Sequence, residues 1–132
     1  ESLQGKQFDL GKLEIFAGQY LFWDLKNTPE LQQAHEATLR LVKYVDHEKL
    51  KLAPHASLSL TEQQTESVKK YGHPLSGDAY LPHITIAADS KGLSLPDGIT
   101  ELPHQFTVDS SRFSEMGKNG RVENLIEITN EI

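Results

Sequence analysis

Residues 7–25, QFDLGKLEIFAGQYLFWDL, determine the architecture that the rest of the chain completes. Apolar and polar side chains alternate over residues 7–17, which is the period-2 pattern of a β-strand with one covered face. The alternation changes phase at Gly11, and this predicts a β-bulge there. Gly18 allows the chain to turn, and the aromatic-rich residues 19–25 form a second strand. The two strands predict a β-sheet as the framework of the fold.

Two helices are expected after these strands. Thr28 is a suitable N-cap and a proline follows it, so a helix is predicted over residues 29–45. Thr61 and Gln64 have the spacing of a capping box, which starts a second helix. Gly72 ends that helix in the left-handed conformation.

Further strands are predicted in the second half of the chain. The clearest is residues 80–88, and two more are expected at 105–115 and 121–129, joined by the hairpin signal Lys-Asn-Gly at 118–120. The element order is β-β-α-(α)-β-β-β. It predicts an α+β fold with an antiparallel or mixed sheet and helices packed on one face, in a single domain spanning residues 1–132.

Composition limits the classes of function. The chain has 132 residues, 37% hydrophobic and 24% charged, as in a globular domain of one core. A formal charge of −6 argues against a broad basic surface for duplex nucleic acid. The chain has no cysteine, so disulfides and thiolate chemistry are excluded. No apolar run reaches membrane-spanning length, so no membrane partner is expected. No signal-peptide pattern is visible, and a cytoplasmic location is the default expectation.

The segment PHITI at residues 82–86 is the strongest candidate for chemistry. On a strand, His83 and Thr85 point to one face, while Ile84 and Ile86 point to the other and are expected to fill the core. A neutral imidazole accepts a proton, an imidazolium donates one, and a hydroxyl binds a phosphoryl oxygen. The pair therefore predicts a phosphate site. The alternative is a half-exposed strand whose polar face meets water.

Two neighbouring features bear on this prediction. Ala87 is expected on the face of the histidine, where its small side chain leaves room for a ligand. His55 and Ser57 form a weaker second copy of the His-x-hydroxyl pattern, on a loop or a very short strand. The alternative for His55 is an ordinary surface histidine.

Three more side chains are candidates for binding a substrate, namely Tyr80, Trp23 and Arg112. On its strand, Trp23 faces away from Tyr20 and Phe22, and it is suited to stacking on a base. Core packing is the more common use of such aromatics. An arginine beside the last hairpin is able to clamp a phosphate, although a single arginine carries little information.

The remaining histidines have plainer interpretations. His35 is expected to face solvent or the edge of the core, and His73 follows the helix-ending glycine and is expected to be structural. The sequence has neither a histidine pair at helical i, i+4 spacing nor an HExxH motif. We therefore expect no metal and no cofactor.

At PHITI the sequence resembles the 2H phosphoesterase superfamily, which includes the RNA 2′,3′-cyclic phosphodiesterases, also called 2′-5′ RNA ligases. Residues 18–25, GQYLFWDL, are similar to the family strand that precedes a helix. Residues 27–35, NTPELQQAH, are similar to the start of that helix. The lead-in over residues 60–83 and the closing hairpin extend the resemblance to roughly residues 7–129.

The resemblance implies two lobes that face each other across a cleft, each with one His-x-Thr/Ser motif. One histidine acts as general base and the other as general acid on a cyclic phosphate or a 2′-5′ or 3′-5′ phosphodiester, without a metal. The substrate is an RNA end, a cyclic nucleotide or a small oligonucleotide. His83 and Thr85 match the second motif. The first is expected before Glu1 or on a separate chain, because His55 lies too close to His83 for a lobe between them.

The sequence also departs from the family. Ala87 and Ala88 stand where many relatives have a basic residue after the motif, which puts contacts with an RNA backbone in doubt. Three hypotheses follow: a metal-independent phosphoesterase, a nucleotide- or phosphate-binding module without turnover, and an interaction protein with no phosphate site. The acidic net charge favours a small nucleotide over long RNA in the first case.

Overall fold

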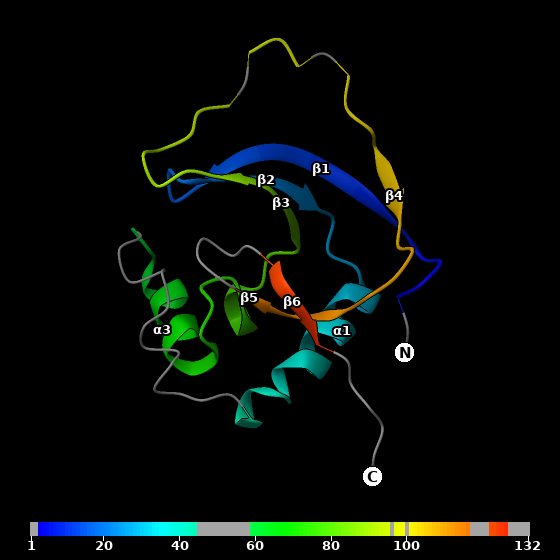
Figure 1. Ribbon diagram of the computed structural model, residues 1–132, viewed down its shortest axis with the longest axis vertical. Coiled ribbons are helices and arrows are strands. Elements are labelled where there is room, and N and C mark those ends of the chain that lie inside the picture. The colour runs from blue at the N-terminus through cyan, green and yellow to red at the C-terminus, as the bar shows by residue number, and fades with distance from the viewer. Residues whose placement is uncertain (1–2, 45–58, 96, 100, 117–121, 127–132) are drawn as a thin grey trace.

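The chain is described here from a computed structural model (Figure 1). The structure describes residues 3–44, 59–95, 97–99, 101–116 and 122–126. Its elements form an α+β fold, in agreement with the prediction from sequence.

A curled four-stranded sheet is the centre of the fold, and β1 arches over the top of it in Figure 1. Its strands are β1 (Gln7–Phe16), β2 (Tyr20–Leu25), β3 (His83–Ala88) and β4 (Gln105–Thr107). They lie in the order β3-β2-β1-β4, and all neighbours are antiparallel. Strands β5 (Phe113–Met116) and β6 (Val122–Ile126) form a separate antiparallel pair.

The predicted bulge in β1 is confirmed. Leu10 pairs with Leu25 and Leu13 pairs with Trp23, so two residues of β1 oppose one residue of β2. Gly11 is one of the two, and a Cβ at that position would lie 3.3 Å from the Cβ of Asp24. Glycine therefore suits the close approach of the two strands.

The turn between β1 and β2 is a tight hairpin turn with two central residues. Ala17 and Gly18 have φ values of 51° and 71°, and the amide of Gln19 donates to the carbonyl of Phe16 at 3.1 Å. Positive φ at both central positions matches the twist of antiparallel strands, so the turn closes a tight hairpin.

A second bulge lies in β3 and was not predicted. The cross-strand partners are Tyr20↔Ala88, Leu21↔Ala87, Phe22↔Thr85, Trp23↔Ile84 and Asp24↔His83. Ile86 has no partner in this register, so it is an extra residue and the chain changes face after it. The expectation that Ala87 shares a face with Thr85 is therefore wrong, and Ala87 lies on the side of Leu21.

The core lies on the face that carries Phe22, which is only 4% exposed. Directly opposed residues on neighbouring strands share a face, so the same side carries His83 and Thr85. Neither isoleucine of β3 is buried on this covered face. Ile84 is 37% exposed and Ile86 is 48% exposed. The prediction that they fill the core is wrong, because the core forms on the face of the buried β2 aromatics.

The core cluster joins the sheet to the segment after the second helix. Tyr20 and Phe22 from β2 pack against Leu75, with Phe16 and Leu81 at the margin. The rings of Phe16 and Phe22 stack with centroids 5.2 Å apart. Burial of these side chains holds residues 72–83 against the sheet, and this positions the start of β3.

The first helix is shorter than predicted. α1 spans Pro29–Leu39, and a 3-10 turn, η1, follows at Val42–Tyr44. Thr28 caps it as expected, with its hydroxyl accepting from the Leu31 amide at 3.3 Å. The final turn tightens to i, i+3 bonds, because the amide of Leu41 donates to the carbonyl of Thr38 at 2.9 Å.

The second helix matches its prediction closely. α3 spans Glu62–Tyr71, and both hydrogen bonds of the Thr61–Gln64 capping box are present. Gly72 ends it in the left-handed conformation, with φ at 78°. The following segment, expected as a loop, contains a short 3-10 helix, η3, at Gly77–Ala79.

The later strands are shorter than the predicted ranges. The strand expected over 80–88 begins only at His83, since Pro82 before it has no amide hydrogen to pair. The strand expected over 105–115 is two strands, β4 and β5. The predicted turn at 118–120 lies outside the described residues.

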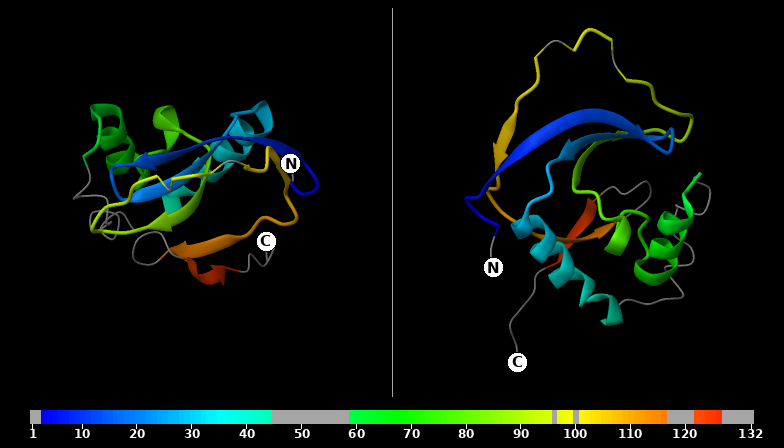
Figure 2. Two further views of the ribbon diagram at one scale, coloured as in Figure 1. Left: turned by 90° about the horizontal axis from the view of Figure 1, so that it is seen from above. Right: turned by 180° about the vertical axis from the view of Figure 1, so that it is seen from behind.

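The two helices lie on the same side of the molecule. In the view from above, α1 and α3 occupy one side of the molecule and the β5–β6 pair lies on the other (Figure 2, left). The placement of both helices on one side agrees with the prediction. Neither helix of the described part has the length and apolar character needed to cross a membrane.

Candidate functional site

His83 begins β3 and is held by contacts on two sides. Its ring stacks on that of Phe22, with centroids 3.9 Å apart and planes 20° apart. Its Nδ1 lies 2.7 Å from the carbonyl oxygen of Leu81. A carbonyl only accepts hydrogen bonds, so Nδ1 carries the proton. In the neutral ring, Nε2 therefore has the lone pair that accepts a proton.

The surroundings of His83 favour this neutral form. Burial lowers the pKa of the His83 imidazole below its ordinary value, and the bond to Leu81 and the charge of Asp24 only partly oppose this. A histidine with a lowered pKa is uncharged near neutral pH. It is thus in the protonation state that a general base requires.

A second histidine lies next to the first. The ring centroids of His73 and His83 are 6.5 Å apart, with planes 15° apart. The amide of Leu75 donates to Nδ1 of His73 at 3.2 Å. An amide N–H only donates, so Nδ1 is the unprotonated nitrogen and Nε2 carries the hydrogen in the neutral ring.

The structure therefore brings together two imidazoles in opposite tautomers. A hydrogen bond between Nδ1 and a backbone group fixes the tautomer of each ring. His83 has its lone pair on Nε2, and His73 has its hydrogen on Nε2. Sequence reasoning treated His73 as structural, because its pairing with His83 depends on how the chain folds back after Gly72.

Thr85 completes the group on this face of β3. It lies across from Phe22, on the same side of the sheet as His83, and its side chain is exposed. Its hydroxyl is both donor and acceptor, so it is suited to hold a phosphoryl oxygen close to the imidazole. The predicted pairing of His83 and Thr85 on one face is confirmed by the register.

Two carboxylates lie on the same face as His83. Asp24 is directly opposite it across the strands, and Glu14 is opposite Phe22 on β1. Burial and the nearby charge of Glu14 raise the pKa of Asp24, while Lys12 and His83 lower it. The Lys12 ammonium is 2.9 Å from a carboxylate oxygen of Glu14. The charges around His83 are thus predominantly negative.

The structure places the three substrate-binding candidates apart from His83. Trp23 is on the opposite face, as predicted, and its Nε1 donates to the Gly11 carbonyl at 3.3 Å. Tyr80 stacks on His35, and burial raises the pKa of its phenol. Within the described residues, no hydrogen bond, ion pair or ring contact joins either aromatic to His83.

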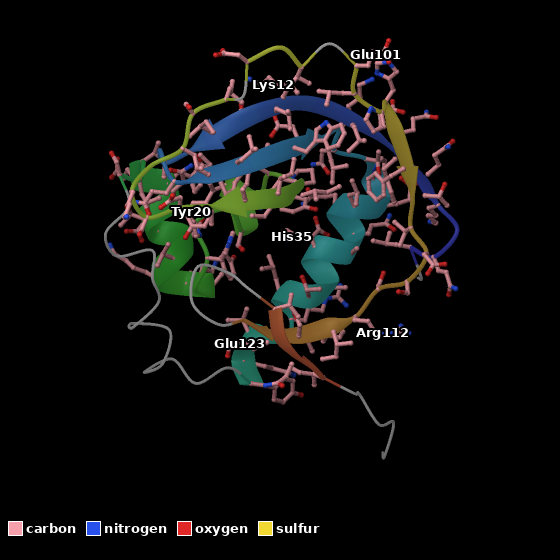
Figure 3. All side chains as sticks on the ribbon, turned by 45° about the horizontal axis from the view of Figure 1, so that its top comes forward. Lys12, Tyr20, His35, Glu101, Arg112 and Glu123 are labelled. Atoms are coloured by element: carbon pink, nitrogen blue, oxygen red, sulfur yellow. The ribbon has the colours of Figure 1, made fainter. Side chains whose placement is uncertain are left out.

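The third candidate lies apart from the site, and the weaker motif is not among the described residues. Arg112 is exposed near β5, where its guanidinium donates to the Ser111 carbonyl at 3.1 Å (Figure 3). His55 and Ser57 lie outside the described residues. The candidate site in the described part of the chain consists of His83, Thr85 and His73, which the sequence analysis had treated as structural.

His35 lies at the edge of the core, the second of the two alternatives expected for it. It projects from α1 towards the centre of the molecule (Figure 3), and its Nε2 accepts from the Gly77 amide at 2.9 Å. Its ring stacks on Tyr80 with centroids 3.8 Å apart and planes 6° apart. His35 therefore joins α1 to η3 and to the segment that leads to His83.

This contact makes stability depend on pH. Burial lowers the pKa of His35, and Glu36 only partly opposes this. The folded state then binds fewer protons than the unfolded state, so stability is full above the ordinary pKa of about 6.5 and falls as pH decreases through it. We expect the urea midpoint of the wild type to fall from pH 7.5 to pH 5. His35→Gln keeps an acceptor for Gly77 and should show a smaller fall.

The control for this prediction is His104→Gln, a substitution at an exposed histidine of the segment before β4. It should leave the pH dependence of the midpoint as it is in the wild type. An identical pH dependence in His35→Gln and in the wild type would contradict the assignment to His35.

Two surface cavities lie elsewhere. One of about 250 Å³ is lined by α3 and η3 residues, among them Lys70, Tyr71 and Asp78, and another of about 70 Å³ lies between Lys6 and α1. Neither is lined by His83. The described part of the chain also contains no cluster of three or more histidine and carboxylate side chains placed to hold a metal ion.

The comparisons with known proteins identify no relative, so a functional assignment depends on the geometry described above. No protein-family model matches the chain, and no curated protein or solved structure matches it either.

Proposed function

We propose that the chain is a phosphoesterase that cleaves a cyclic phosphate or a 2′-5′ or 3′-5′ phosphodiester of RNA or of a nucleotide by histidine acid–base catalysis. The observation that carries the proposal is the pair of opposite tautomers, with His73 and His83 centred 6.5 Å apart. General acid–base cleavage needs one proton acceptor and one proton donor at the same phosphorus. The pair supplies a proton acceptor in Nε2 of His83, which is the proton donor once protonated, and a hydrogen-bond donor in the Nε2–H of His73.

The reaction divides the work between the two Nε2 atoms. Nε2 of His83 takes a proton from a water molecule, whose oxygen forms the new bond to phosphorus. The bond from phosphorus to the leaving oxygen breaks while the Nε2–H of His73 donates a hydrogen bond to that oxygen, and the His83 imidazolium formed in the first step then gives it the proton. The Thr85 hydroxyl donates to a non-bridging oxygen, where negative charge develops. With a 2′,3′-cyclic phosphate, the product is a phosphate monoester.

This arrangement changes one expectation about the second histidine. In the proposal, His73 is the second histidine at the phosphorus, the position that the family resemblance places in a first motif on another segment. The two lobes and the cleft implied by the resemblance stay predictions, as does a cytoplasmic location. The formal charge of −6 supports a small nucleotide as substrate, because a long polyanion gains little attraction from such a chain.

The test is a turnover assay followed by phosphorus NMR. Purified chain is incubated with 2′,3′-cyclic nucleotides and with 2′-5′ and 3′-5′ dinucleotides, with a chelator present. We expect a monoester resonance to grow at the expense of the substrate. The absence of product from every substrate, together with unperturbed ring resonances of His83, would overturn the proposal.

A binding module without turnover is the second candidate. It is favoured by the restricted access to His83, whose ring is half-buried and stacked on Phe22. Such a module would give saturable shifts of the His83 resonances with phosphate or nucleotide and no product. The same NMR samples distinguish the two functions.

A further inference from the structure

We propose that Asp24 is a positioning residue for His83, and that its carboxylate stabilises the protonated imidazole from across the strand pair. The inference rests on the proposed function, in which His83 receives a proton during the reaction. Its basis is the register of β2 and β3, which places Asp24 directly opposite His83 on the same face of the sheet.

The environment of the Asp24 carboxylate is unusual. Its Oδ1 is buried and has no hydrogen-bond partner among the described residues. Most buried polar atoms are paired, since leaving one unpaired costs free energy. A buried oxygen is also closed to a substrate. We conclude that Oδ1 acts on the neighbouring residue of the sheet through its charge and not through contact with a ligand.

Among the charged and titratable groups around Asp24, His83 is the one that we infer as its electrostatic partner. Lys12 and Glu14 face it from β1, His83 faces it from β3, and His73 lies beyond His83. Lys12 is bound to Glu14 at 2.9 Å, so much of its charge is offset there. A proton on His83 places a positive charge beside a carboxylate whose Oδ1 has neither an ion pair nor a hydrogen bond within the described part of the chain.

The coupling between the two groups is reciprocal. The charge of His83 lowers the pKa of Asp24, and the charge of Asp24 raises the pKa of His83. Burial acts against both charged forms, so each is favoured when the other is present. The proton that arrives on His83 during the proposed reaction is therefore stabilised by a charge already in place.

Asp24→Asn tests this with little change of shape. NMR titration of the ring resonances should show a lower pKa for His83 than in the wild type, with that of His35 unchanged. In the turnover assay kcat should fall roughly tenfold with KM nearly constant, because the contact acts after binding. Glu14→Gln is the matched control, and it should change the pKa of His83 less than Asp24→Asn does.

Two outcomes separate this inference from the proposed function. An unchanged His83 pKa in folded Asp24→Asn would overturn the inference, whatever the activity. A lowered pKa in a chain whose wild type has no turnover would keep the electrostatic coupling and overturn the catalytic role. If Asp24→Asn does not fold, the wild type supplies the test. The carboxyl ¹³C shift of Asp24 should then show an inflection at the pKa of His83, and its absence would count against the coupling.

Discussion

His83→Ala is expected to lower turnover of the preferred cyclic or linear phosphodiester by about 10²–10⁴-fold, the usual contribution of a positioned acid or base. The variant removes the Nε2 lone pair that takes the proton from water. It also removes the ring that stacks on Phe22. His83→Gln keeps a polar side chain of similar length, and it should be almost as inactive because an amide does not accept the proton.

His73→Ala is expected to lower activity by about 10²–10³-fold, since the leaving oxygen then loses the hydrogen bond from the Nε2–H of His73. The two imidazoles act on one phosphorus, so the double variant should be hardly worse than either single one. His104→Ala is the control at an exposed histidine, and circular dichroism verifies that each variant is folded. Full activity in His73→Ala would remove it from the mechanism and return the second histidine to another segment or chain.

The pH profile gives an independent measure of the base. Activity should fall as pH drops through the pKa of His83, because the protonated ring no longer accepts a proton. Burial lowers that pKa, so the fall should lie below the ordinary histidine value of about 6.5. An acid limb at or above the ordinary value would place the base at a different group.

The parts of the fold that follow from local chemistry were predictable from sequence. The phase change at Gly11 identified the β1 bulge, and the Thr61–Gln64 spacing with Gly72 fixed both ends of α3. The alternation of β2 correctly separated Trp23 from its aromatic neighbours. Each of these signals depends on residues adjacent in the chain or one turn apart, so tertiary contacts did not change them.

The features that depend on distant contacts were not predictable. The bulge at Ile86 is visible only once β3 is paired with β2, and it reverses the expected face of Ala87. The approach of His73 to His83 requires the connection after α3 to return to the sheet, where Leu75 joins the core. The His83–Thr85 pair was predicted from period-2 spacing alone, whereas its covered face depends on where the core forms.

Gly77→Ala is expected to be the most destabilising substitution of a small residue in the described part of the chain. Gly77 has φ at +61°, a conformation that costs other residues about 1–2 kcal/mol. An added Cβ would also overlap the Tyr71 ring. We expect a total loss of about 2–5 kcal/mol in the free energy of unfolding, measured by urea denaturation, because overpacking adds roughly 1–3 kcal/mol to the strain.

Gly5→Ala isolates the strain from the overlap. Gly5 also has positive φ, at +77°, but an added Cβ would meet no atom within 4 Å, so only the backbone cost of about 1–2 kcal/mol should be lost. A Gly77→Ala variant no less stable than Gly5→Ala would show that α3 does not press on η3 at this point. The larger loss should be accompanied by a weaker pH dependence of stability, because the amide of Gly77 is the donor to His35. The hydrogen bond from the Gly77 amide to His35 would then be the contact through which α1 holds the connection that places His73 beside His83.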